Sequence, residues 1–157
     1  DICKRAASFD MEIGYHNRRP RADADARYFD SLAGLAAWCD ALMISVRASD
    51  ATRHAVDAGV LAALGADGHV INIARGSVID EAALIDALQR GVIAGAGLDV
   101  FEHEPDVPPA LLALPGVVAL PHIGGASREG QAAMQAMTLA NLEAFFAGAP
   151  IPSPVAG

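Results

Sequence analysis

Short apolar runs alternate along the chain with segments in which apolar residues recur at helical spacing. The residues between Asp80 and Gly91 are the clearest helical segment, because Ala83, Leu84, Ala87 and Leu88 share one face of a helix. The run at residues 41–46 is continuously apolar, which is typical of a strand covered on both faces. The pattern predicts strands at residues 11–16, 41–46, 69–73, within 92–100, and at 117–120.

Helices are expected to begin at short polar residues that can cap their first turn. Ser31, Asp57 and Asp80 each precede an apolar periodic segment, and Gly65 and Gly91 follow two of these segments as helix stops. We therefore predict helices at residues 1–8, 31–39, 57–64, 80–90 and 129–147. The Pro-rich residues 104–109 are expected to form a loop.

Strands that alternate with helices predict an α/β fold with a doubly wound parallel sheet. In such sheets, ligands bind beyond the carboxyl ends of the strands. Every strand named above leads into a polar or glycine-containing turn at that edge, and we interpret these turns as the rim of an active site. They contain Asn17 to Arg19, Arg47, Arg75, Asp99 with Glu104, and His122 with Gly124.

These residue types suit the reduction of a 2-oxo acid. An arginine can hold a carboxylate through two parallel hydrogen bonds, and a histidine can give or take a proton near neutral pH. A carboxylate beside that histidine stabilises its charged form. The hydride would come from a nicotinamide cofactor, because no side chain supplies one.

Composition limits the alternatives. The 157 residues have the length of one domain, and the formal net charge of −8 argues against a nucleic-acid partner. Cys3 and Cys39 form no metal-ligand or redox pattern, which favours packed, reduced thiols in a cytoplasmic protein and no metal site. No apolar run approaches the ~20 residues that a membrane span needs.

Two long motifs carry a family resemblance. Residues 70–105 (VINIARGSVIDEAALIDALQRGVIAGAGLDVFEHEP) and 120–127 (LPHIGGAS) resemble the D-isomer-specific 2-hydroxyacid dehydrogenases. The resemblance extends from about residue 1 to residue 148, and GYHNRRPR at residues 14–21 resembles the glyoxylate/hydroxypyruvate reductases. It implies an oxidoreductase that transfers a hydride between NADP(H) or NAD(H) and a small 2-oxo or 2-hydroxy acid, usually as a homodimer.

The resemblance also implies roles for individual residues. Arg75 would bind the substrate carboxylate and polarise its carbonyl, His122 would be the general acid in reduction, and Glu104 would be the partner of His122. Asp99 would contact the nicotinamide end of the cofactor. The cofactor-lining positions implied are Val46, Ile73, Ala74, Arg75, Asp99, His122 and Gly124.

Several of these residues have simpler interpretations. Arg75 could be a capping arginine and Asp99 a loop acid, and Glu102 competes with Glu104 as the partner acid. Asp80 and Glu81 are better explained as helix start signals than as catalytic acids. The remaining histidines are expected to be surface or structural residues: His16, His54, His69 and His103.

The turn after the first predicted strand indicates the cofactor. NAD-dependent members place an acid there to bind the ribose hydroxyls, whereas this chain has Asn17, Arg18 and Arg19. Arginines offer charge-assisted hydrogen bonds to the extra phosphate of NADP, so NADP is favoured over NAD. The alternative is that these arginines are solvated loop charges.

The resemblance implies a partial domain. Residues 1–148 would be most of a dinucleotide-binding domain, and residues 149–157 a tail that returns to a substrate domain absent from this chain. The family's first strand and Gly-rich loop are lacking, so that strand's neighbours would have no partner, and we expect the isolated chain to be inactive. Arg47 departs from the family, which often has proline there.

Other interpretations of the chain's function are an NAD-dependent dehydrogenase of another 2-hydroxy acid, a dinucleotide-dependent binding protein, and a non-catalytic truncated fragment.

Overall fold

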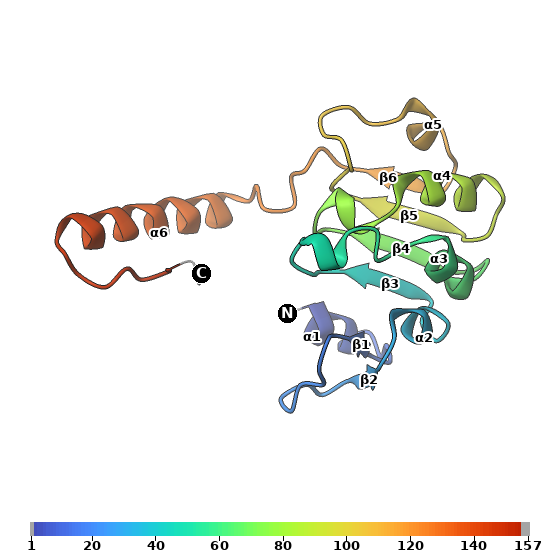
Figure 1. Cartoon of the computed structure of the whole chain (residues 1–157), viewed down its shortest axis with the longest axis horizontal. Coiled ribbons are helices and arrows are strands. Elements are labelled where there is room, and N and C mark those ends of the chain that lie inside the picture. The colour runs from blue at the N-terminus through green and yellow to red at the C-terminus, as the bar shows by residue number, and fades with distance from the viewer. Residues whose placement is uncertain (1, 155–157) are drawn as a thin grey trace. The chain divides into compact units, whose positions relative to one another are not determined.

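The computed structural model describes residues 2–154, so Asp1 of the predicted first helix and residues 155–157 of the tail lie outside it. The chain divides into two compact units, Asp1–Leu120 and Pro121–Gly157. The first unit is α/β and contains the strands, and the second contains one long helix (Figure 1).

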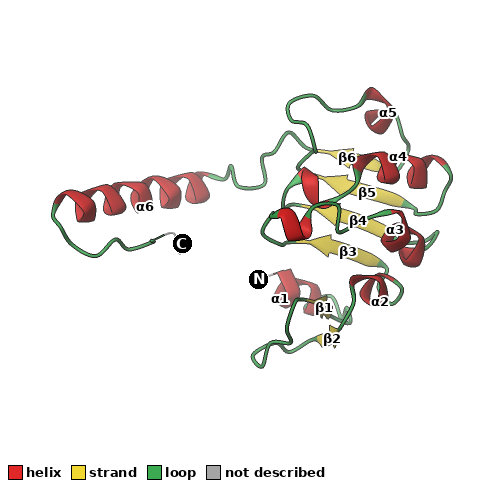
Figure 2. Cartoon of the chain, in the orientation of Figure 1, coloured by secondary structure: helices red, strands yellow, loops and turns green. Residues whose placement is uncertain are grey.

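The larger sheet of the first unit is parallel throughout, with strand order β3-β4-β5-β6 (Figure 2). Consecutive strands are joined by helices, which confirms the α/β fold with a parallel sheet predicted from the alternation. The strands are β3 (Ala41–Ile44), β4 (His69–Asn72), β5 (Gly95–Leu98) and β6 (Val117–Ala119), and the connecting helices are α3 (Ala58–Leu64), α4 (Glu81–Gln89) and α5 (Pro109–Leu112). Pro109 at the first position of α5 shortens the loop predicted at residues 104–109.

A separate two-stranded parallel sheet precedes this one. It pairs β1 (Gly14–His16) with β2 (Arg27–Phe29), and two short helices flank it, α1 (Ile2–Ala7) and α2 (Leu32–Ala36). The strand predicted at residues 11–16 is shorter because β2 offers only three partners, and β2 itself was not predicted. The strands β1 and β3 belong to different sheets and are not hydrogen-bonded to each other.

Capping explains where the helices begin. The side chains of Ser31, Asp57 and Asp80 accept hydrogen bonds from the backbone N–H three residues later, at 3.2, 2.9 and 3.0 Å. Such caps satisfy N–H groups that the first turn of a helix leaves unpaired. Gly65, with a φ of 82°, ends α3 in a conformation that few other residues adopt. The predicted starts of these helices are therefore confirmed.

The core lies on one face of the larger sheet. Leu42, Val70 and Leu98 point into it and are buried together with Leu61 of α3 and Leu84 of α4. The opposite face is open within this unit, where Met43 is 41% and Val118 is 62% exposed. The expectation that residues 41–46 are covered on both faces is therefore wrong for this unit, because α2, α3 and α4 pack beside one another over the same core.

The cysteines differ from each other. Cys39 is half-buried, and burial raises the pKa of its thiol. Cys3 is exposed, so the expectation that both thiols are packed is wrong for Cys3, because α1 buries none of its residues.

The second unit is dominated by α6 (Arg128–Phe146), whose first turn is capped by Ser127 through a 3.0 Å hydrogen bond from Gly130. The tail folds back on the helix, where Asn141 and Ser153 form two hydrogen bonds of 2.7 and 3.2 Å. Neither this helix nor any other between residues 2 and 154 is long and apolar enough to cross a membrane.

Gly76 begins the 3-10 turn η2 (Gly76–Val78), where two backbone segments meet. A Cβ atom at this position would overlap the backbone of Phe101 and of Glu102. Backbone atoms cannot move aside as the end of a side chain can, so glycine is required here.

We predict that Gly76→Ala destabilises the chain by about 3 kcal/mol, because the methyl group forces the turn away from Phe101. Urea unfolding followed by circular dichroism would measure this. Gly59→Ala is the matched control, since the nearest atom to its Cβ is a side-chain oxygen of Asp57 at 3.3 Å. Equal midpoints for the two variants would contradict the role given to Gly76.

Candidate active site

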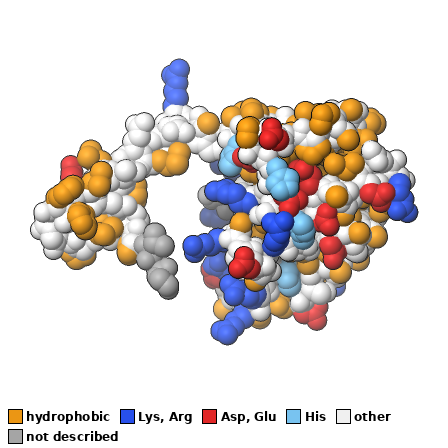
Figure 3. All heavy atoms as spheres, turned by 45° about the horizontal axis from the view of Figure 1, so that its top comes forward, with side chains coloured by type: hydrophobic (Ala, Val, Ile, Leu, Met, Phe, Trp, Pro, Cys, Tyr) orange, Lys and Arg blue, Asp and Glu red, His pale blue; other side chains and the backbone are white. Residues whose placement is uncertain are grey.

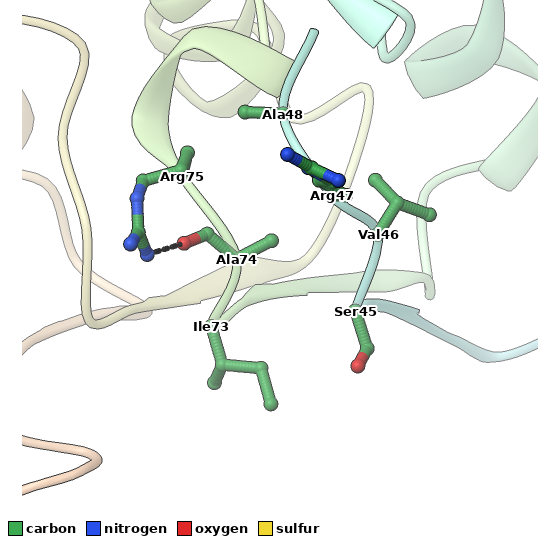
Figure 4. A pocket seen from close by; sticks show the side chains of 7 residues that line it. All are labelled: Ser45, Val46, Arg47, Ala48, Ile73, Ala74 and Arg75. Carbon is green, nitrogen blue, oxygen red and sulfur yellow. Dashed lines mark hydrogen bonds between the residues drawn. The ribbon is translucent and has the colours of Figure 1, made fainter. Parts of the chain in front are cut away.

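The carboxyl ends of β3 and β4 border an open pocket of about 520 Å³ (Figure 4). Two turns line it, one after each strand, and both were predicted to face a ligand. Its lining residues are Ser45, Val46, Arg47, Ala48, Ile73, Ala74 and Arg75. Ser45 and Ala48 were not singled out from the sequence, although their position directly after a strand could have indicated them. Arg47, predicted to lie at the rim and noted as a departure from the family, is also part of the lining.

A buried amide shapes the turn after β4. Asn72 lies beside Ile44 and Leu98 in the sheet and is completely buried. Its Oδ1 accepts a hydrogen bond from the N–H of Ala74 at 3.0 Å, and its Nδ2 donates to the carbonyl of Arg75 at 2.9 Å. These bonds satisfy the buried amide and hold the backbone of the turn. This role of Asn72 was not predicted from the sequence.

The side chain of Arg75 is exposed at the edge of the pocket. One nitrogen of its guanidinium donates to the carbonyl of Ala74 at 2.6 Å, as Figure 4 shows. A guanidinium carries five N–H donors in a planar fork, so this bond uses only part of its capacity. Arg75 therefore has the chemistry needed to bind a carboxylate through two parallel bonds.

The segment after β5 carries two predicted site residues. Asp99 is buried, and its N–H donates to the carbonyl of Asn72 at 3.0 Å. Glu104 is exposed, and its Oε1 accepts a hydrogen bond from the N–H of Phe101 at 2.9 Å. Phe101 is buried in the core, so it anchors the loop that bears Glu104.

Glu102, the competing acid, has structural partners. Its Oε1 accepts hydrogen bonds from Nε2 of His54 at 2.7 Å and from the guanidinium of Arg53 at 2.9 Å. Burial raises the pKa of Glu102, but the hydrogen bond from His54 and the charges of His54 and Arg53 outweigh it, and the pKa lies below its usual value. The backbone N–H of Glu102 donates to Glu81 at 3.2 Å.

The other histidines and acids behave as structural or surface residues, as predicted. Nδ1 of His16 lies 2.9 Å from the carbonyl of Phe29, in hydrogen-bond contact, and His69 and His103 are exposed. Asp80 caps α4, and Glu81 is buried beneath the loop of Glu102.

The turn after β1 is rich in basic side chains. Arg18 and Arg19 are exposed, and the N–H of Arg18 donates to Oδ1 of Asn17 at 2.9 Å. Arg21 is paired instead with Asp23 at 2.7 Å. In Figure 3 basic side chains gather on the side of the first unit that lies at the left in the view. Arg18 and Arg19 are therefore accessible to an anion.

His122 belongs to the second unit. It is exposed, and its φ of 53° is in the left-handed region, which histidine occupies more readily than most residues. The next residues form a turn in which the N–H of Ala126 donates to the carbonyl of Ile123 at 2.9 Å, directly before the cap of α6. Gly124 lies in this turn.

Histidine, cysteine and acidic side chains form no cluster of three or more that could hold a metal ion within residues 2–154.

Comparison with known proteins places this arrangement in a family. Residues 1–124 match the family described as the NAD-binding domain of D-isomer specific 2-hydroxyacid dehydrogenases. The chain belongs to this family. The fold class and the resemblance predicted from the sequence are thereby confirmed.

Two relatives of the chain are named as reductases. It is 42% identical over 154 residues to a 2-ketogluconate reductase of Gluconobacter oxydans, and the match covers 98% of this chain and 50% of the relative. It is 44% identical over 154 residues to a glyoxylate/hydroxypyruvate reductase of Arabidopsis thaliana, covering 98% of this chain and 49% of the relative. The chain therefore spans about half the length of these relatives.

A solved structure is similarly close. The NADPH-dependent glyoxylate/hydroxypyruvate reductase of Sinorhizobium meliloti, in complex with NADP and malonate, matches with a TM-score of 0.96 and 47% identity. This match covers 99% of the present chain and 49% of that protein.

We predict that Asn72→Ala lowers the free energy of unfolding by about 3 kcal/mol, because it leaves the N–H of Ala74 and the carbonyl of Arg75 unpaired. Asn141→Ala removes exposed hydrogen bonds between α6 and Ser153 of the tail, and it should lower the free energy of unfolding by less than about 1 kcal/mol. Urea unfolding of both variants tests the difference. A loss at Asn72 no larger than that at Asn141 would show that the buried amide does not hold the turn.

Proposed function

We propose that this chain supplies most of the dinucleotide-binding domain of an NADPH-dependent reductase of small 2-oxo acids, such as glyoxylate or hydroxypyruvate. The observation that carries the proposal is Arg75, exposed at a pocket beyond the end of β4 and held there by buried Asn72. A carboxylate is the ligand that best fits a planar guanidinium in such a turn. The names of the relatives support the same substrate class.

In this proposal, Arg75 binds the carboxylate of the substrate and polarises the neighbouring carbonyl. His122 carries the proton that the carbonyl oxygen receives on reduction, and Glu104 stabilises the charged form of His122. Glu104 is preferred to Glu102 because the carboxylate of Glu102 is already bound by His54 and Arg53. When bound, NADPH supplies the hydride.

The residues of the first unit fit a phosphorylated dinucleotide. Arg18 and Arg19 are exposed after β1, where they can donate to the phosphate that distinguishes NADP from NAD. We propose that Asn17, Val46, Ile73, Ala74 and Asp99, with Arg75 and with His122 and Gly124 of the second unit, form the remaining cofactor contacts. The solved relative that is NADPH-dependent supports this choice.

We further propose that residues 1–148 belong to the dinucleotide-binding domain and that residues 149–157 lead to a substrate domain. The full-length protein would act as a cytoplasmic homodimer without a nucleic-acid partner, in agreement with its formal net charge of −8. A second candidate function is the reduction of a longer 2-oxo acid, favoured by the identity to a 2-ketogluconate reductase.

Replacing both Arg18 and Arg19 with glutamine in the full-length protein should raise the KM for NADPH at least tenfold more than the KM for NADH. The lost charge-assisted bonds to one phosphate correspond to about 1.5–3 kcal/mol. Steady-state kinetics with each cofactor measure the ratio. Arg21→Gln is the control, because Arg21 is paired with Asp23. Equal effects on both cofactors would reject the NADP assignment.

Arg75→Lys should lower kcat/KM for the 2-oxo acid by about 10²-fold, because it keeps the charge but loses the planar fork. His122→Gln should remove the proton donor, and both variants should weaken NADPH binding far less than they lower kcat/KM, because most of the proposed cofactor contacts remain. Assays against glyoxylate, hydroxypyruvate and 2-ketogluconate, with NADPH affinity from fluorescence titration, test this and rank the substrates. Wild-type rates in both variants would disprove the catalytic assignment, whereas a wild type that binds NADPH but reduces no 2-oxo acid would favour a dinucleotide-dependent binding protein.

A further inference from the structure

We propose that His54 and Glu102 are positioning residues, which hold the loop bearing Glu104 against the turn bearing Arg75. The inference rests on the proposed function, because it assigns a purpose to the fixed spacing of these two site residues. It concerns contacts within the first unit alone, and four of them define the arrangement.

The first two contacts hold the loop after β5 through the side chain of Glu102. Glu102 has a side chain that is only 10% exposed, and its Oε1 accepts from Nε2 of His54 at 2.7 Å and from Arg53 at 2.9 Å. His54 and Glu102 are 48 positions apart in the sequence, so this contact joins two separate loops. The side chains of His54 and Glu102 are 35% and 10% exposed, and a hydrogen-bonded pair that is partly buried in this way is stronger than a fully exposed ion pair.

The third contact holds the same loop through the backbone N–H of Glu102. The N–H of Glu102 donates to the carboxylate of Glu81, at the start of α4. The neighbouring N–H, that of Phe101, donates to Glu104 itself at 2.9 Å. Consequently, a shift of Glu102 moves the backbone group on which the Glu104 carboxylate rests.

The fourth contact connects His54 to the turn of Arg75. The N–H of His54 donates to the carbonyl of Ser77 at 2.9 Å, within the turn that follows Arg75. Gly76 of that turn approaches Phe101 and Glu102 too closely for any Cβ. His54 therefore contacts the Arg75 turn through its backbone and the Glu104 loop through its imidazole.

The backbone conformation of His54 supports a role in positioning the two loops. Its φ of 50° is in the left-handed region, which is costly for a residue other than glycine. The surrounding contacts must hold this conformation, and they are the same contacts that join the two loops. The lowered pKa of Glu102 agrees with a carboxylate that remains charged in this setting.

The test uses the full-length protein and four single variants. Glu102→Gln removes the charge at constant shape, and His54→Asn shortens the side chain with a residue that tolerates positive φ. Arg53→Gln removes the more exposed partner of Glu102, and Asp86→Asn removes the exposed Arg90–Asp86 ion pair as a matched control. The kcat, the KM for NADPH and the thermal midpoint are measured for each, and the Glu102 change is repeated in a Glu104→Gln background.

We expect Glu102→Gln and His54→Asn to lower kcat about tenfold with less than about twofold change in the KM for NADPH, since misplaced catalytic groups slow turnover rather than cofactor binding. Asp86→Asn should change kcat by less than about twofold, and Arg53→Gln should lower kcat less than His54→Asn does, because Arg53 is the more exposed partner of Glu102. In the Glu104→Gln background, Glu102→Gln should have less than about a twofold further effect, because both changes disable the same group.

The proposal would be overturned if the fold-loss of kcat in the double variant equalled the product of the fold-losses of the two single variants. Such a result would mean that Glu102 acts independently of Glu104. Wild-type kcat in both Glu102→Gln and His54→Asn would also overturn it. A wild-type kcat and pH profile in Glu104→Gln alone would instead reject the partner role of Glu104 in the proposed function, and this inference with it. If Glu102→Gln does not fold, His54→Asn in the two backgrounds provides the same comparison.

Discussion

The backbone of Gly76 meets the backbone of Phe101 and Glu102 so closely that no side chain fits between them. This approach brings the turn after β4 against the loop after β5, and each of these carries a residue of the proposed active site. Asn72 stabilises the turn after β4 through two hydrogen bonds, and Phe101 anchors the loop after β5 in the core. The placement of Arg75 and Glu104 thus depends on the packing of Asn72, Gly76 and Phe101.

Around this contact, three carboxylates have different surroundings. Glu81 accepts a hydrogen bond from the N–H of Glu102, Glu102 is bound by two basic side chains, and the exposed Glu104 accepts a hydrogen bond from the N–H of Phe101. The role proposed for Glu104 agrees with its exposure. The same contrast distinguishes Arg53, which pairs with Glu102, from Arg75, which faces a pocket.

Local patterns were sufficient to predict the elements that have strong local signals. The capping residues Ser31, Asp57 and Asp80 and the apolar runs at β3, β4 and β6 lie where the sequence analysis expected them. The strand β2 was missed because three residues among charged neighbours have no periodicity. The pairing of His54 with Glu102 and the buried role of Asn72 could not be predicted, since they depend on contacts between segments distant in the chain and on burial that no local pattern encodes.

The distribution of charge has a kinetic consequence. The chain is acidic overall, with a formal net charge of −8, yet exposed Arg18, Arg19, Arg47 and Arg75 follow the carboxyl ends of β1, β3 and β4. A local positive potential on an acidic body attracts small anions to one edge and repels them elsewhere. Anionic ligands should therefore be guided toward the strand ends during diffusion, and ionic strength would slow their arrival through screening over a distance of roughly 10 Å.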